Sequence, residues 1–358
     1  MVAVENQTEL GPWTGADLSR TVRETLDHGA DADLPNEVRF VAGIAKLIRR
    51  RLVEAGAEMD SRRLAVFLLE PIARAYKPDA TPTRVPMLDN GLEEVTGRIW
   101  FVSPVVVAGS YVDFGDCDDD ELFYIVTEKL NLGNVPVIIF DPRTTIPEVR
   151  FYKNGLNDPE RYDRVRLNPD ISLPRIFEVI DRLYRECLVT PDAQERGGTL
   201  WADNTRNRPS RNAESIVQVY LRAGLTTVFP TCTVRPEQTS VPGRLDLEIE
   251  ESDPFDRAIF TRHAILELKV LRSFGSTGGT VTEQAMLKWI DKGVKQAAAY
   301  RRARGAVAAA LCCFDMRLED TGETSFEHVA DLAQRIEVAL KRWFIYATSE
   351  DYREALTA

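Results

Sequence analysis

The sequence AILELKVL, residues 264–271, is an apolar run that is interrupted by one acid, Glu267, and one base, Lys269. Successive side chains alternate across a β-strand, so these two charged groups would share one face, roughly 6–7 Å apart. A second run, RLDLEIE at 244–250, alternates apolar residues with acids, of which the first is Asp246. If the two runs pair as a hairpin, acidic side chains of both strands lie side by side.

Carboxylates that converge inside a sheet repel each other unless a cation neutralises them. Mg²⁺ does so with oxygen ligands, and it typically takes one or two carboxylates together with water and phosphate oxygens. A neighbouring lysine can orient a metal-bound water or stabilise developing negative charge. Asp246, Glu267 and Lys269 therefore predict metal-assisted attack on a phosphodiester, with Mg²⁺ as the cofactor and Mn²⁺ as its substitute.

The elements that must position these residues follow one another in the second half of the chain. The order of the predicted elements is α-β-β-β-α-β-α, which indicates a mixed α/β core. They are a helix at 212–223 closed by Gly224, strands at 226–235, 243–250 and 263–271, a helix from the Thr280/Glu283 capping box to about 304, a strand at 306–316 and a helix at 326–346.

Four sequence features in this order resemble the PD-(D/E)xK nuclease superfamily. They are Glu214 in the helix before the sheet, GRLD at 243–246, ELK at 267–269 and QAAAY at 296–300. Leu245 stands where the superfamily motif has proline, and the last feature is similar to the QxxxY motif of the RecB-like branch. The resemblance covers roughly residues 205–320 and implies a restriction-endonuclease-like mixed sheet flanked by helices.

The resemblance also implies a role for each matching residue. The metal would be held by Asp246, Glu267 and the carbonyl of Leu268, while Lys269 would position the attacking water. Glu214 would bind a second metal or a metal-bound water. Gln296 and Tyr300 would orient the lysine or contact the DNA backbone.

The charge distribution permits a DNA partner although the net charge is −11. Residues 196–358 hold 22 basic and 22 acidic side chains, so the whole excess of acid lies in residues 1–195. The region 269–304 is locally basic and could meet a phosphate backbone. The predicted DNA-binding residues are Lys288, Lys292, Lys295 and Arg301 of this region, with Arg208 and Arg211 of the preceding polar segment.

Residues 1–195 predict a separate α+β domain, followed by the nuclease domain at 196–358. The boundary is placed in the polar segment 190–211, which is rich in Gly and Pro. The expected elements of the first domain are helices at 36–56, 61–76 and 173–188 and strands at 97–109 and 135–141. The domain would confer specificity, regulate the nuclease or bind a protein partner through its acidic surface.

Other acidic groups have simpler interpretations. Glu248 and Glu250 are expected at a solvated strand end, with Glu248 as a minor candidate ligand. The run DFGDCDDDE, residues 113–121, does not have Gly and a final Glu at the positions that an EF-hand loop requires, so a solvated loop is expected there.

The composition disfavours several other classes of protein. No run of about 18 apolar residues and no secretory leader pattern is present, which predicts a cytoplasmic protein without membrane contact. Five cysteines without CxxC spacing fit reduced thiols better than a disulfide framework or a zinc site. Only three histidines are present, which disfavours histidine-dependent metal or nucleophile chemistry.

The sequence therefore predicts a Mg²⁺-dependent DNA endonuclease or nickase in restriction, phage defence or DNA phosphorothioate modification. The alternatives are a RecB-like exonuclease in repair and a catalytically inactive module for DNA binding or assembly. The oligomeric state is left open, with a homodimer among the options.

Overall fold

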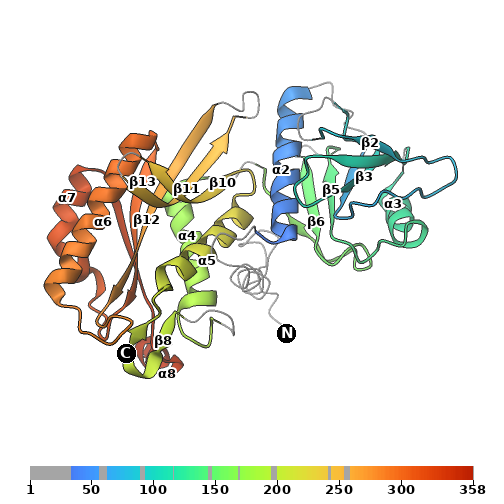
Figure 1. Cartoon of the computed structure of the whole chain (residues 1–358). Helices are drawn as coiled ribbons and strands as arrows, with labels where there is room; N and C mark the ends of the chain where they lie inside the picture. The colour runs from blue at the N-terminus through green and yellow to red at the C-terminus, as the bar shows by residue number, and fades with distance from the viewer. Residues whose placement is uncertain are drawn as a thin grey trace.

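The chain is a mixed α/β protein with two large sheets, as predicted, in the computed structural model (Figure 1). The structure describes residues 34–55, 63–88, 93–115, 117–143, 147–167, 170–194, 200–240, 243–253 and 259–357. No helix in these ranges combines the length and the apolar character that crossing a membrane requires.

The first half builds a seven-stranded sheet with the order β2-β4-β3-β1-β5-β6-β7. Helix α2 packs its apolar face on one side of this sheet, and α3 packs on the other (Figure 1). The elements are α2 (Asn36–Ala55), β1 (Ala65–Leu68), β2 (Thr83–Val85), β3 (Arg98–Val102), β4 (Gly109–Asp113), α3 (Asp119–Tyr124) with the π-helical turn Ile125–Lys129, β5 (Val137–Asp141), β6 (Glu148–Tyr152) and β7 (Asp163–Arg164).

The predicted helix at 61–76 is wrong. Its apolar centre, Ala65–Leu68, is strand β1, which lies between β3 and β5 and is buried on both faces. A short run of consecutive apolar residues fits a central strand and a buried helix equally well, because it has no hydrophobic periodicity. The predicted strand at 97–109 is likewise two antiparallel strands, β3 and β4.

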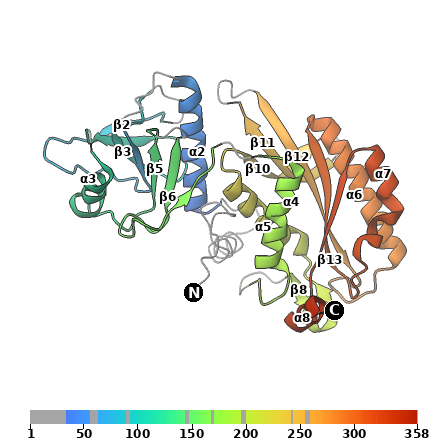
Figure 2. The ribbon, with the colours of Figure 1, turned by 180° about the vertical axis from the view of Figure 1, so that it is seen from behind.

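The second half builds a five-stranded sheet with the order β10-β11-β12-β13-β14. Helices α6 and α7 cover one face of it, and α4 and α5 cover the other (Figures 1 and 2). The elements are α4 (Leu173–Leu183) with the π-helical turn Tyr184–Leu188, β8 (Trp201–Asp203), a 3₁₀ turn (Asn204–Arg206), β9 (Arg208–Pro209), α5 (Ala213–Val228), β10 (Thr233–Ser240), β11 (Gly243–Ser252), β12 (Phe260–Arg272), α6 (Glu283–Arg304), β13 (Ala308–Met316), a 3₁₀ segment (Gly322–Val329), α7 (Ala330–Arg335), β14 (Ala339–Phe344) and α8 (Ser349–Thr357).

The predicted C-terminal helix at 326–346 is wrong, because that segment is divided between a 3₁₀ segment, α7 and β14. Strand β14 runs parallel to β13, and Trp343 stacks on Phe314 with ring centroids 5.1 Å apart. This cross-strand packing is a tertiary contact, so local periodicity carries no signal of it.

The limits of two further helices differ from the prediction. Helix α5 continues through Gly224 to Val228, so the expected strand at 226–235 begins only at Thr233. A Cβ on Gly224 would lie 2.5 Å from Leu183 Cδ1, which shows that the glycine permits close packing of α4 on α5. Helix α6 is capped by Thr282 rather than Thr280, and the Thr282 side chain accepts the backbone N–H of Ala285.

Helix α4 packs with the second half of the chain. Its residues Ile176, Val179 and Ile180 belong to the same hydrophobic cluster as α5 and the five-stranded sheet. Trp343 Nε1 on β14 donates a 2.7 Å hydrogen bond to Asp181 Oδ1. The division at 195/196 remains a prediction, while the hydrophobic packing groups α4 with the residues that follow it.

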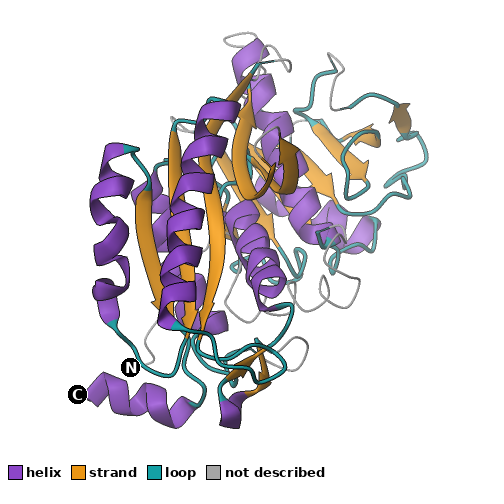
Figure 3. Cartoon of the chain, turned by 60° about the vertical axis from the view of Figure 1, so that its left-hand side comes forward, coloured by secondary structure: helices purple, strands orange, loops and turns teal. Residues whose placement is uncertain are grey.

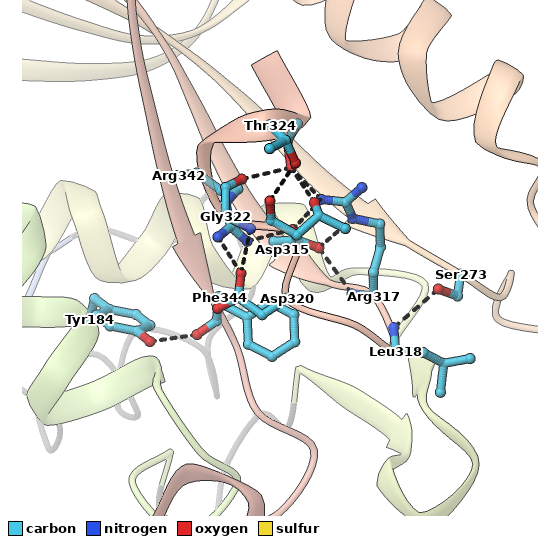
Figure 4. A network of polar contacts seen from close by, with 12 residues as sticks. Tyr184, Ser273, Asp315, Arg317, Leu318, Asp320, Gly322, Thr324, Arg342 and Phe344 are labelled. Carbon is cyan, nitrogen blue, oxygen red and sulfur yellow. Dashed lines mark hydrogen bonds and ion pairs between the residues drawn. The ribbon is translucent and has the colours of Figure 1, made fainter. Parts of the chain in front are cut away.

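A buried carboxylate fixes the end of β13 (Figure 4). Asp315 is completely buried and accepts hydrogen bonds from Arg317 Nε at 2.9 Å and from Arg342 Nη1 at 2.8 Å. The backbone N–H of Leu318 then donates to Ser273 Oγ at 3.1 Å. The network therefore joins β13, β14 and the loop that leaves β12.

Candidate functional site

Strands β11 and β12 bring Asp246, Glu267 and Lys269 together, as the hairpin prediction required. Asp246 Oδ2 accepts the backbone N–H of Leu268 at 2.7 Å across the two strands. Lys269 Nζ donates to Glu267 Oε1 at 2.6 Å and to the Leu268 carbonyl at 3.0 Å. An ammonium has three N–H donors, so one remains beyond these two bonds.

Two charged groups of this cluster are almost completely buried, and Asp246 is half-buried. Glu267 is 1% exposed and Lys269 is 4% exposed. Burial, together with the negative charge of Asp246, raises the pKa of Glu267 to about 7, although Lys269 acts in the opposite direction. Burial lowers the pKa of Lys269, but Glu267, Asp246 and Glu214 outweigh this effect and raise it. The lysine is therefore a permanent cation beside a carboxyl group that is difficult to ionise.

Glu214 joins the cluster from the first turn of α5. Burial and the charge of Asp246 raise the pKa of Glu214, while Lys269 and a hydrogen bond with the Val270 backbone lower it. The sequence-predicted metal ligands thus converge from three elements on one lysine. When the three carboxyl groups are all ionised, one ammonium does not neutralise their negative charge.

Helix α6 crosses one face of the five-stranded sheet and closes the site on that side (Figure 3). A Cβ on Gly293 would lie 3.3 Å from Lys269 Cγ and 2.7 Å from Leu311 Cδ1. Only glycine lets the helix come this near to the lysine without a shift of its neighbours.

Gln296 and Tyr300 lie on the same helix, one turn apart. Tyr300 is buried, forms a hydrogen bond with Gln296 and is close enough to Glu267 for the carboxylate to raise its pKa, after burial as the larger cause. Gln296 Oε1 and Glu267 Oε2 are both buried without a hydrogen-bond partner. The site therefore holds two buried acceptor oxygens that lack a donor.

Two residues of the site were missed by sequence reasoning. The ring centroid of Trp289 lies 5.2 Å from Lys269 Nζ on one side and 5.5 Å from Lys292 Nζ on the other. Trp289 lies on one helical face with residues 293, 296 and 300. The helical periodicity of the segment with the QxxxY motif could therefore have predicted that Trp289 faces the site. Gln218 donates from Nε2 to the Asp246 carbonyl at 2.7 Å, and no sequence pattern marked it.

The predicted DNA-binding residues have different surroundings. Lys288, Lys292 and Lys295 are exposed on α6, and Lys295 Nζ lies 2.7 Å from Asp291 Oδ2. Arg301 forms an ion pair with Glu337, Arg208 lies against Gly278 and Arg211 is exposed. Lys292 is thus exposed and close to the carboxylate cluster through Trp289.

The interpretation of Glu248 and Glu250 as a solvated strand end is wrong. Glu248 is completely buried, and Arg304 of α6 binds it with two hydrogen bonds of 3.0 and 2.8 Å. Arg262 Nε lies 3.2 Å from the same carboxylate, and Arg235 pairs with Glu250. Arginines from other elements cover these acids, which strand alternation alone does not reveal.

Comparison of the chain with protein-family models, curated proteins and solved structures finds no match. The nuclease resemblance therefore rests on the residues and their geometry.

The pKa of Glu267 predicts a pH-dependent stability in the absence of metal. The folded protein retains a proton that the unfolded chain releases between about pH 4.5 and pH 7, so stability falls as the pH rises through this window. We expect Asp246→Asn to stabilise the protein more at pH 8 than at pH 5, by about 1–2 kcal/mol, because it removes the repulsion on ionised Glu267. Urea unfolding in EDTA at both pH values measures the difference.

Asp79→Asn is the matched control, because Asp79 carries an exposed carboxylate in the first half of the chain. A change in unfolding free energy for Asp246→Asn that is the same at both pH values would contradict the electrostatic coupling.

Proposed function

We propose that the chain is a Mg²⁺-dependent DNA endonuclease or nickase, with a PD-(D/E)xK-like nuclease domain in its second half. The observation that carries this proposal is the buried Glu267 beside Lys269 and the half-buried Asp246, with Glu267 Oε2 lacking a hydrogen-bond donor. Neighbouring carboxyl groups that are costly to ionise together suit a site that a divalent cation completes.

The donor set fits a hard divalent cation. Asp246, Glu267 and the Leu268 carbonyl would hold Mg²⁺ or Mn²⁺, and Glu214 would hold a second ion or its water. All of these donors are oxygens, which Mg²⁺ and Mn²⁺ prefer. When bound, the ion would supply Lewis acidity for attack on a phosphodiester.

Lys269 would position the attacking water with its third N–H. Its stem is confined by α6 near Gly293, and its ammonium is held by two acceptors and faces the Trp289 ring. Its raised pKa keeps the ammonium protonated, so it would act as a fixed donor and positive charge rather than as a base. Gln296 and Tyr300 would support Glu267 from the same helix.

The substrate surface would include the exposed lysines of α6, because they share a helix with Trp289 and Lys292 lies over its ring. The first half of the chain, which carries the excess acid, would select the DNA or bind a protein partner. Restriction, phage defence and phosphorothioate modification are settings that suit such an enzyme. A RecB-like exonuclease and an inactive DNA-binding module are the alternatives that the assay below distinguishes.

We expect the wild-type protein to nick supercoiled plasmid with Mg²⁺ or Mn²⁺ and to be inactive in EDTA. Glu267→Gln should abolish nicking, because a neutral amide cannot replace a metal-binding carboxylate. Glu128→Gln should keep full activity, because Glu128 is exposed in the first half of the chain, away from the candidate site. Gel electrophoresis of supercoiled, linear and single-stranded DNA measures the outcome.

Degradation restricted to linear DNA would favour the exonuclease. Binding without cleavage of any substrate would favour the inactive module and refute the proposed activity.

We expect Lys269→Met to lower single-turnover cleavage by about 10²-fold or more while Mn²⁺ still binds, because the variant loses a positioned donor and charge. Lys269→Arg should also fail, since a planar guanidinium does not reproduce a compact ammonium. Calorimetry measures Mn²⁺ binding beside the cleavage rate. Full recovery of Lys269→Met at high metal concentration would show that the lysine only neutralises the carboxylates.

We expect the charge reversals Lys288→Glu and Lys292→Glu to weaken DNA binding and to lower the slope of log K against log salt by about one for each lost phosphate contact. Salt titrations monitored by fluorescence anisotropy measure the slope. Lys129→Glu serves as the control, because Lys129 is also exposed but lies in the first half of the chain. Superimposable titrations for the α6 variants and the wild type would place the DNA surface elsewhere.

A further inference from the structure

A second cluster of chemically reactive side chains lies at the opposite end of β11 from Asp246. Cys232 precedes β10, Glu251 is near the end of β11 and His263 is near the start of β12. One donor atom from each of these three residues lies within 4.8 Å of the other two. Glu251 and Asp246 are five residues apart, or roughly 17 Å along an extended strand, so the two clusters are separate.

A β-bulge directs His263 into this cluster. Ile249 pairs with Ala264 but Glu250 pairs with Arg262, so His263 is the extra residue of β12. A bulge re-aims a side chain and is a common device where a strand builds a site. His263 Nε2 thereby lies 3.5 Å from Glu251 Oε2.

The donor atoms are available to a ligand. Thr231 Oγ1 donates to Glu251 Oε1 at 2.8 Å and Arg49 pairs with the same oxygen, so Oε1 is anchored while Oε2 faces the histidine. His263 Nε2 is buried, and its contact with Glu251 Oε2 at 3.5 Å is too long for a good hydrogen bond. Cys232 is 1% exposed. An unbonded buried imidazole nitrogen is costly unless something pairs with it.

A reactive thiol is a poorer explanation of the cluster. Burial raises the pKa of Cys232 to about 12, whereas nucleophilic cysteines have lowered pKa values and access to substrate. The cysteines in the described part of the chain are free thiols, so none of them supplies a disulfide partner.

We propose that Cys232, Glu251 and His263 bind a zinc ion. Thiolate, imidazole and carboxylate are the ligand types of protein zinc sites, and the thiolate selects against Mg²⁺. Tetrahedral zinc places such donors about 3.5 Å apart, so the side chains need to close by roughly 1 Å. The thiolate and the carboxylate together balance the two charges of the ion.

The site would fasten α2 to the five-stranded sheet. Arg49 of α2 orients the Glu251 ligand, and Lys46 of α2 donates to Thr233 Oγ1 at 2.8 Å, one residue after Cys232. In metal sites, a carboxylate ligand is commonly held in position by hydrogen bonds to the oxygen that does not bind the metal. A pocket of about 300 Å³ lies beside the cluster, and its lining includes Arg49 and Thr231, which both contact Glu251.

The test counts zinc in the purified full-length protein after loading and gel filtration. It uses an Asp246→Asn background, so that the proposed nuclease site does not contribute. We expect one bound zinc, and a loss of it in Cys232→Ser and in His263→Gln. Cys117→Ser and His328→Gln are matched controls outside the cluster and should keep the ion.

Cobalt substitution covers the case in which a variant fails to fold. The Co²⁺-loaded parent protein should show thiolate-to-cobalt charge transfer and the intense visible bands of tetrahedral cobalt. The proposal is overturned if the parent protein binds no zinc, if the folded ligand variants retain it, or if the cobalt protein lacks the thiolate band. None of these readouts depends on cleavage of DNA, so the proposed nuclease function stands or fails separately.

Discussion

The candidate site depends on one electrostatic constraint, which is that a single buried ammonium faces three carboxyl groups. Taking an ion out of water costs several kcal/mol even after relaxation, so this arrangement persists only because the surrounding fold holds it. Lys269 bonds to Glu267 and to a backbone carbonyl, and Asp246 accepts a backbone N–H from the neighbouring strand. Each bond reduces the cost, but none removes the surplus of negative charge. That surplus is the strongest physical argument for a cation at this place.

Helix α6 is held against the sheet at two points. The absence of a side chain at Gly293 permits the close approach of the helix to Lys269. At the end of the helix, Arg304 donates two hydrogen bonds to the buried carboxylate of Glu248. The face that carries Trp289, Gln296 and Tyr300 is therefore fixed over the ammonium. Lys288, Lys292 and Lys295 are exposed on the same helix, and the Lys292 ammonium lies over the Trp289 ring. One helix thus serves the interior of the site and its approach.

Side-chain alternation was enough to predict the strands around Asp246 and Glu267 and, with the two strands paired as a hairpin, the convergence of Asp246, Glu267 and Lys269. It was not enough where tertiary contacts decide the structure. The run at 65–68 is a central strand because β3 and β5 pair with both of its edges and hydrophobic clusters bury both of its faces. The segment 339–344 is a strand because β13 offers it an edge. Glu248 looked solvated because the arginine that covers it lies 56 residues away. Distant partners of this kind leave no local pattern.

The replacement of a predicted helix by β14 has a consequence for how copies of the chain meet. It makes β14 one border of the sheet, while β10 is the other. An edge strand has unpaired backbone groups that can pair with a strand of another molecule, and charged side chains or proline on the edge strand discourage this pairing. Strand β14 carries Lys341 and Arg342, and β10 carries Pro236. Both borders of this sheet thus carry residues that discourage the addition of a strand from another copy of the chain.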